Sequence, residues 1–155
     1  MGSIKMKKPH RIAAGGIILK KDAILLVRYG TGPDSYLVGP GGAVEEVENI
    51  EQAIVREAME ETGITVRPYK VLWIEDLQRS RYKMIKTWML CDAVTSDVAN
   101  TDGARAEGIT EARWFSKDEL VETVVFPPPI MQTDWSELFS DKWQTVCLPS
   151  CVTSF

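Results

Sequence analysis

The chain has 155 residues, of which 45% are hydrophobic and 26% are charged, and its formal net charge is −4. We expect one globular domain over residues 1–155, and the composition excludes a disordered, collagen-like or fibrous chain. Because basic residues are not in excess, net charge does not draw the chain onto nucleic acid or an anionic membrane.

The cysteines indicate a reducing compartment. They are odd in number and widely spaced, at Cys91, Cys147 and Cys151, which is a poor framework for disulfides. No apolar run approaches the roughly 20 residues needed to span a bilayer. We therefore expect a cytoplasmic protein with no membrane partner.

The first predicted elements are two strands joined by a tight turn. Residues 11–19 (RIAAGGIIL) and 23–28 (AILLVR) are apolar and flank a short polar segment, a pattern typical of a hairpin. Residues 30–42 contain five glycines and two prolines. This composition favours a loop whose backbone can approach a ligand closely.

A helix is predicted over residues 50–62, where apolar residues recur at helical spacing. Asn49 is placed as its N-cap, with Gln52 three residues later as in a capping box. Gly63 is the expected C-terminal stop.

The remaining chain predicts further strands and short helices. Residues 65–74 and 82–94 have strand composition and can join the hairpin in one sheet. Residues 95–110 are polar and predict a loop, followed by a short strand at 112–115 and a capping box at 116–119 that opens a short helix.

The C-terminal segment gives weaker signals. Prolines at 127–129 break the chain, and one helix is expected within residues 132–142, with Trp135, Leu138 and Phe139 turned inward. The last dozen residues give no clear signal.

The chemistry is concentrated on the predicted helix. Glu57, Glu60 and Glu61 stand at positions i, i+3 and i+4, so their carboxylates converge on one face and repel one another. Arg56 and a divalent cation are the candidates for the compensating charge. Oxygen ligands with no His or Cys nearby select Mg²⁺, with Mn²⁺ as the alternative, rather than Zn²⁺.

A solvated acidic helix face is the ordinary interpretation of such a pattern. Against it, the opposite face of the helix is apolar and must pack, which fixes the direction of the acidic face. Residues 45–61 also hold seven of the 22 acidic residues but only one of the 18 basic residues. The acidity is therefore local, as expected for a metal site.

Residues 42–64 resemble the Nudix box of the Nudix hydrolase superfamily. The family pattern is Gly, five residues, Glu, seven residues, Arg-Glu, an aliphatic position, any residue, Glu-Glu, any residue, Gly and an aliphatic position. The residues that fill it without a gap are Gly42, Glu48, Arg56, Glu57, Ala58, Glu60, Glu61, Gly63 and Ile64. A pattern of this length is very rare by chance.

The resemblance, which includes the MutT-like members, covers about residues 11–121. Pro40-Gly41-Gly42 is similar to the family's approach to the box, and residues 111–120 resemble its closing strand and short helix. The implied fold is α/β (α+β), with a mixed β-sheet sandwiched between α-helices. Residues 122–155 lie outside the resemblance and are expected to form a C-terminal extension packed on the domain.

The resemblance also implies roles for single residues. The implied metal ligands are Glu57, Glu60, Glu61 and the backbone carbonyl of Gly41. The implied catalytic residues are Glu57, Glu60, Arg56 and Glu107. The implied structural or orienting residues are Gly42, Glu48 and Gly63, with Glu48 as the carboxylate partner of Arg56.

Two positions vary within the family. The general base is sometimes a box glutamate and sometimes one on a later loop, where Glu107 fits and Glu111 is a weaker candidate. Gly39 stands where many members have leucine before the proline, which predicts a looser turn.

The substrate is not fixed by the sequence. Tyr82 falls near a tyrosine that marks diadenosine polyphosphate hydrolases, and Arg28 and Arg81 are weak candidates for phosphate contacts. The tryptophans in predicted strands and helices are more often core residues than stacking platforms.

The implied function is Mg²⁺-dependent hydrolysis of a diphosphate bond in a nucleoside diphosphate linked to another group, with water as the nucleophile. The expected partner is a small-molecule nucleotide, and a homodimer is compatible with the sequence. Two alternatives stay open: a non-catalytic nucleotide-binding regulatory module and a pyrophosphohydrolase acting on RNA ends.

Overall fold

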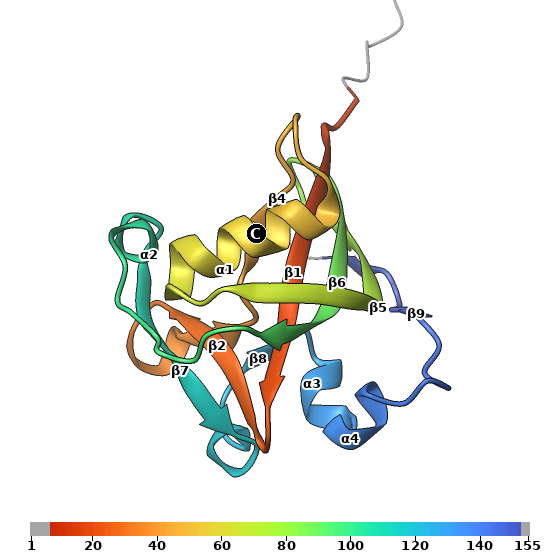
Figure 1. The fold of residues 1–155 in the computed structure, drawn as a ribbon. Helices are drawn as coiled ribbons and strands as arrows, with labels where there is room; N and C mark the ends of the chain where they lie inside the picture. The colour runs from red at the N-terminus through yellow and green to blue at the C-terminus, as the bar shows by residue number, and fades with distance from the viewer. Residues whose placement is uncertain (1–6, 153–155) are drawn as a thin grey trace, which may run out of the picture.

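The structure is a computed structural model, and it describes residues 7–152 (Figure 1). Within this range the strands are β1 (His10–Lys20), β2 (Ala23–Tyr29), β3 (Tyr36–Val38), β4 (Gly41–Ala43), β5 (Val66–Gln78), β6 (Lys83–Ala93), β7 (Ile109–Ser116), β8 (Val125–Phe126), β9 (Val146–Cys147) and β10 (Cys151–Val152). The helices are α1 (Ile50–Thr62), α2 (Asp102–Ala106), α3 (Pro129–Gln132), α4 (Trp135–Leu138) and the 3-10 helices η1 (Gly32–Asp34) and η2 (Asp118–Leu120).

β1 is the strand around which the sheet is organised. It pairs in parallel with β6, and antiparallel with both β2 and β4. The strand order is β10-β5-β6-β1-β2-β3-β8, with β4, β7 and β9 pairing off this path with β1, β2 and β5. The sheet is therefore mixed, as the sequence predicted.

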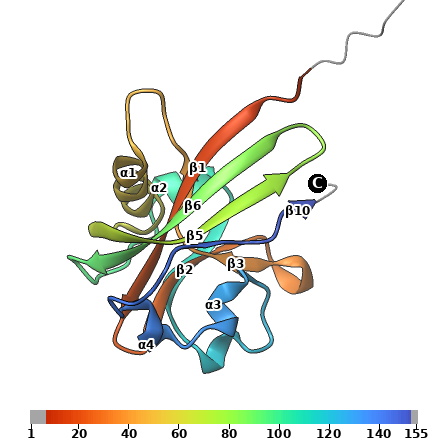
Figure 2. The same cartoon turned by 90° about the vertical axis from the view of Figure 1, so that its right-hand side faces the viewer.

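Alternating side chains of β1 and β6 serve two different cores. Ile17 packs in a cluster with Trp135 and Leu138 of α4, whereas its neighbour Ile18 packs in a cluster with Ile54 of α1. Figure 2 shows α1 on one side of these strands and α3 with α4 on the other. The predicted sandwich of a mixed sheet between helices is confirmed.

The helix α1 has the predicted ends. The side chain of Asn49 accepts a hydrogen bond from the backbone N–H of Gln52, and the Gln52 side chain accepts one from the N–H of Asn49. Gly63 closes the helix with φ of 73°, a left-handed conformation that glycine adopts without steric cost.

Described residues beyond 121 pack on the rest of the chain. β8 pairs with β3, while β9 and β10 pair with β5. Ile130, Trp135 and Leu138 are buried in the core on this side of the sheet. The C-terminal segment therefore supplies one of the two helical layers; residues 153–155 lie outside the described part of the chain.

Both predicted loops contain regular structure. Residues 30–42 hold η1, β3 and β4, because β3 pairs with β2 and β4 pairs with β1. Residues 95–110 hold α2, whose N-cap Thr101 accepts a hydrogen bond from the N–H of Ala104. Tertiary pairing of β3 and β4 thus overrides the glycine-rich composition.

Several predicted boundaries were wrong. β5 extends to Gln78 and β7 spans Ile109–Ser116, because pairing with β6 and β2 continues over these residues. The helix expected within 132–142 is the single turn α4, and Phe139 is 47% exposed rather than inward. Pro129 begins α3 instead of ending regular structure, since proline suits the first turn of a helix.

Gly39 is tightly packed, which corrects the looser turn expected from its identity. A Cβ at Gly39 would lie 2.6 Å from the carbonyl oxygen of Gly16 and 2.8 Å from Cζ3 of Trp88. A Cβ at Gly15 would collide with the same Trp88 ring. The buried indole therefore occupies space that side chains at positions 15 and 39 would need.

Gly15→Ala is expected to destabilise the protein by about 1–3 kcal/mol, because the added methyl group overpacks against the Trp88 ring. Combining it with Trp88→Leu should cost less than the sum of the two single changes, since the smaller side chain removes the clash. Urea unfolding of the three variants measures this coupling. Strictly additive losses would show that the indole does not fill this space.

Within residues 7–152, no helix is both long enough and apolar enough to cross a membrane.

Candidate active site

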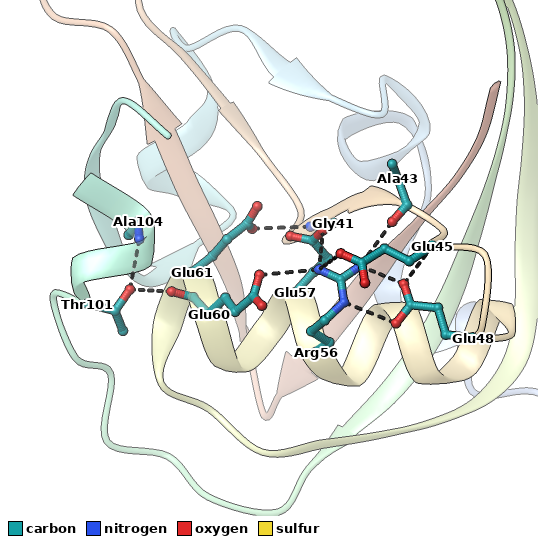
Figure 3. Close-up of polar contacts among 10 residues, drawn as sticks. All are labelled: Gly41, Ala43, Glu45, Glu48, Arg56, Glu57, Glu60, Glu61, Thr101 and Ala104. Atoms are coloured by element: carbon teal, nitrogen blue, oxygen red, sulfur yellow. Dashed lines mark hydrogen bonds and ion pairs between the residues drawn. The ribbon is translucent and has the colours of Figure 1, made fainter. Parts of the chain in front are cut away.

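The box glutamates lie along one edge of α1 (Figure 3). The apolar side of the helix, including Ala53 and Ile54, is buried against the sheet. Glu57 and Glu61, one helical turn apart, are only 5% and 1% exposed, whereas the Glu60 side chain is 47% exposed. The packing of α1 thus buries two carboxylates and leaves the third at the surface.

Arg56 connects the acidic residues. Its guanidinium binds Glu48 through two hydrogen bonds, of 3.0 Å from Nε and 2.6 Å from Nη2. Nη1 donates to Glu57 at 2.8 Å and to Glu60 at 3.2 Å, and Nη2 also donates to the carbonyl of Ala43 at 3.0 Å. The expected pair of Arg56 and Glu48 is present, and it fixes the guanidinium against the glutamates (Figure 3).

The glycines of β4 approach the buried carboxylates. The backbone N–H of Gly41 donates to Oε2 of Glu61 at 3.2 Å. At Gly42, a Cβ would collide with the carboxylate of Glu57. Glycine at these positions therefore allows close contact between backbone and carboxylate, while the role of the Gly41 carbonyl as a metal ligand stays a prediction.

The segment that carries Glu107 is docked on the C-terminal end of α1. The Thr101 hydroxyl donates to the carbonyl of Glu60, and the N–H of Ala99 donates to the carbonyl of Thr62 at 2.9 Å. Glu107 is the C-cap of α2 in this docked segment. Carboxylate oxygens of Glu57, Glu60 and Glu107 all lie within 4.8 Å of one another.

The electrostatics of the site favour protons or a cation. Burial raises the pKa of Glu61 to about 9, and the charges of Glu57 and Glu107 add to this shift. Burial also raises the pKa of Glu57, although hydrogen bonding to Arg56 opposes it. Arg56, in contrast, lowers the pKa of Glu48 to about 2 through its hydrogen bonds. The described residues therefore compensate only some of the acidic charge of the site.

The residues present fit a divalent metal ion. Oε2 of Glu57 and Oε1 of Glu61 are buried and have no hydrogen-bond partner in the described part of the chain, an arrangement that is costly for a carboxylate unless a cation is bound. The carboxylate oxygens that converge within 4.8 Å belong to Glu57, Glu60 and Glu107, and Glu61 is not part of this group; oxygen donors suit Mg²⁺ or Mn²⁺.

Of the other sequence candidates, Arg28, Glu111 and Tyr82 are engaged in other contacts. Arg28 donates a hydrogen bond of 2.8 Å to Glu111, and this contact engages the weaker candidate for the general base. The guanidinium of Arg11 lies 4.0 Å from the ring centroid of Tyr82 and covers one face of it. Arg81 is exposed in the turn between β5 and β6.

Two groups near the carboxylates were missed by the sequence analysis. Burial raises the pKa of Tyr29, and the nearby charges of Glu61 and Glu107 raise it further. Lys86 is half-buried on β6, with its ammonium 4.2 Å from the ring centroid of Trp88. The available signal for Lys86 was a single charged residue inside an apolar run, residues 84–91.

The fold has a mixed sheet between helical layers, and the glycines of β4 contact the glutamates of α1. These features are those of the Nudix class of fold. The chain belongs to this family, because the family model described as the NUDIX domain matches residues 9–135. The match extends past residue 121, where the resemblance in the sequence ended, and includes α3.

Individual relatives agree with this assignment. The ADP-ribose pyrophosphatase of Methanocaldococcus jannaschii is 30% identical over 112 residues, which cover 70% of this chain and 63% of that protein. The NAD-capped RNA hydrolase NudC of Mycobacterium tuberculosis (strain ATCC 25618 / H37Rv) is 31% identical over 121 residues, or 78% of this chain and 35% of that protein. A NUDIX hydrolase from Nitrosomonas europaea superposes with a TM-score of 0.65 at 29% identity, covering 81% of this chain and 85% of that one. The chain thus matches less than two thirds of these two sequence relatives.

Proposed function

We propose that the protein hydrolyses a diphosphate bond in a nucleoside diphosphate linked to a second group, using Mg²⁺. The observation that carries this proposal is the pair of buried carboxylate oxygens, on Glu57 and Glu61, that have no hydrogen-bond partner among residues 7–152. Both residues lie on the helix that bears the family's box, and the oxygens of Glu57 converge with those of Glu60 and Glu107.

The roles follow from the contacts. Glu57, Glu60 and Glu61 would hold the metal, which when bound neutralises diphosphate charge and makes a water molecule more acidic. Arg56 orients Glu57 and Glu60 through the hydrogen bonds described above. Because Glu48 anchors the same guanidinium, its contribution is to position the metal ligands.

Glu107 is the proposed general base. It lies within the carboxylate cluster, and the docking of its segment on α1 holds it there. Glu111 is less suitable, because hydrogen bonds from Arg28 and then Arg113 lower its pKa and occupy its oxygens. A base engaged by two guanidinium groups cannot readily accept a proton from water.

Glu107→Gln is therefore expected to lower kcat by about 10²- to 10³-fold and to alter the pH dependence of kcat. The matched variant Glu111→Gln should change kcat by less than about fivefold, because its contacts are with Arg28 and Arg113. Steady-state kinetics from pH 5 to 9 measures both. Equal losses in the two variants would remove the distinction between these glutamates.

The sequence relatives favour one class of substrate. ADP-ribose and NAD, which the names of these relatives contain, both carry a diphosphate between two ribosyl groups. We propose the same class here, as free nucleotides, with an NAD-capped RNA end as the second candidate.

A panel of compounds tests the proposal. ADP-ribose, NAD, nucleoside triphosphates, nucleotide sugars, dinucleoside polyphosphates and an NAD-capped RNA would each be incubated with Mg²⁺, and the products separated by chromatography. Cleavage between the phosphates of free ADP-ribose or NAD is the expected result. Binding of these nucleotides without turnover of any compound would instead favour the regulatory module.

A further inference from the structure

Lys86 is the one charged residue between Met84 and Cys91 of β6. Its ammonium lies over the Trp88 ring, 4.2 Å from the centroid. In the register of β5 and β6, Lys86 stands opposite Glu75, and Oε1 of Glu75 accepts a hydrogen bond of 2.5 Å from Nε1 of Trp88. The indole is thus fixed by Glu75, and it supports the lysine from one side.

The ammonium of Lys86 has no ion-pair partner among residues 7–152. Within this range, no carboxylate oxygen lies within 4.0 Å of its Nζ atom. The ammonium instead contacts the ring of Trp88. A half-buried ammonium has three donors to satisfy, and the face of an aromatic ring accepts none of them as a normal hydrogen bond. The side chain is therefore available to an anion.

A series of contacts leads from Trp88, which Lys86 covers, to Glu61, one of the proposed metal ligands. The Trp88 ring lies against Gly15, Gly15 is the register partner of Gly41, and the N–H of Gly41 donates to Glu61. Burial lowers the pKa of Lys86, while Glu75, Glu61 and Glu57 oppose that shift, so the carboxylate charges act on the ammonium. These contacts and charges place Lys86 near Glu61, although Lys86 shares its strand parity with Trp88 and Leu90, which pack on the side of the sheet that holds α4.

We propose that Lys86 binds a phosphate group of the substrate, while the glutamates would hold the metal ion. The inference rests on the proposed function for the identity of the anion. A lysine ammonium is a common phosphate ligand. An oxygen anion placed here satisfies donors that the described part of the protein leaves without an acceptor.

The test uses Lys86→Met, which keeps an apolar stem over Trp88 and removes the charge, and Lys86→Arg, which keeps a cation. Lys20→Met is the control, because it removes the same charge from an exposed strand position. Titration calorimetry would measure binding of methylenediphosphonate, a diphosphate analogue, in the presence of Mg²⁺, with Tm recorded for every variant.

Lys86→Met should weaken binding of the analogue about tenfold and reduce the salt dependence of that binding, while Lys86→Arg stays within about threefold of the parent. In turnover assays the loss should fall mainly on KM. The inference is overturned if Lys86→Met binds like Lys20→Met, or if Lys86→Arg loses as much affinity as Lys86→Met at unchanged Tm.

The proposed function fails separately from this inference. If no nucleotide of the panel is cleaved but the analogue still binds in a Lys86-dependent way, the phosphate contact stands without hydrolysis. If nucleotides are cleaved and Lys86→Met retains both KM and analogue affinity, the hydrolase stands and the contact is wrong.

Discussion

Glu61→Gln is expected to lower kcat by about 10²- to 10⁴-fold while leaving the metal-free protein folded with a nearly unchanged Tm at pH 7. Glu61 is 1% exposed and its pKa is raised to about 9, so without metal it carries a proton at neutral pH. Glutamine resembles this neutral form in size and charge, and its amide oxygen can still accept from the N–H of Gly41. Only the ionised state, which a divalent cation requires, is lost.

The matched control is Glu51→Gln, which changes the same charge at an exposed position in the first turn of the same helix. It should retain turnover within about twofold. Glu60→Gln should also lose turnover by orders of magnitude. Circular dichroism and Mg²⁺-dependent kinetics on the three variants check these outcomes, and near-normal turnover in both Glu60→Gln and Glu61→Gln would contradict the assignment of the site.

The parts of the site that lie on one helix could be predicted from the sequence because their signals are local. Asn49, Gln52 and Gly63 determine where α1 begins and ends, and the bounds of the helix agree with the prediction. The spacing of Glu57 and Glu61 then places both carboxylates on one face. The two apolar runs and the polar turn between them also predicted the hairpin of β1 and β2 to within one residue at every end.

The parts that were missed depend on contacts between distant segments. The Thr101 hydroxyl docks α2 on the carbonyl of Glu60, and this contact is between residues 41 positions apart. β9 and β10 are two-residue strands that exist because β5 offers an edge. The tight packing at Gly39 could not be predicted either, because the indole that requires it comes from position 88. Local propensity contains no information on such pairings.

The stability of the metal-free protein is expected to fall as pH rises from about 5 to 9. Glu61 has a pKa of about 9 in the folded state against an ordinary value of 4.5, so between these values the folded protein binds one more proton than the unfolded chain. The free energy of unfolding then decreases by up to about 1.4 kcal/mol per pH unit. Glu57 acts in the same direction, and the lowered pKa of Lys86 acts in the opposite one.

Urea unfolding in EDTA, compared between the parent and Glu61→Gln at each pH, isolates the contribution of this carboxyl group, because the glutamine cannot titrate. The difference in unfolding free energy should shift in favour of Glu61→Gln as pH rises. Mg²⁺ should abolish the trend in the parent alone, because the metal-bound folded state keeps Glu61 deprotonated, as it is in the unfolded chain, and the stabilisation by the metal therefore grows with pH. Mg²⁺ at 100 times its Kd would add about 2.7 kcal/mol. If Mg²⁺ stabilised the parent and Glu61→Gln equally at every pH, the buried carboxylate would not be a ligand.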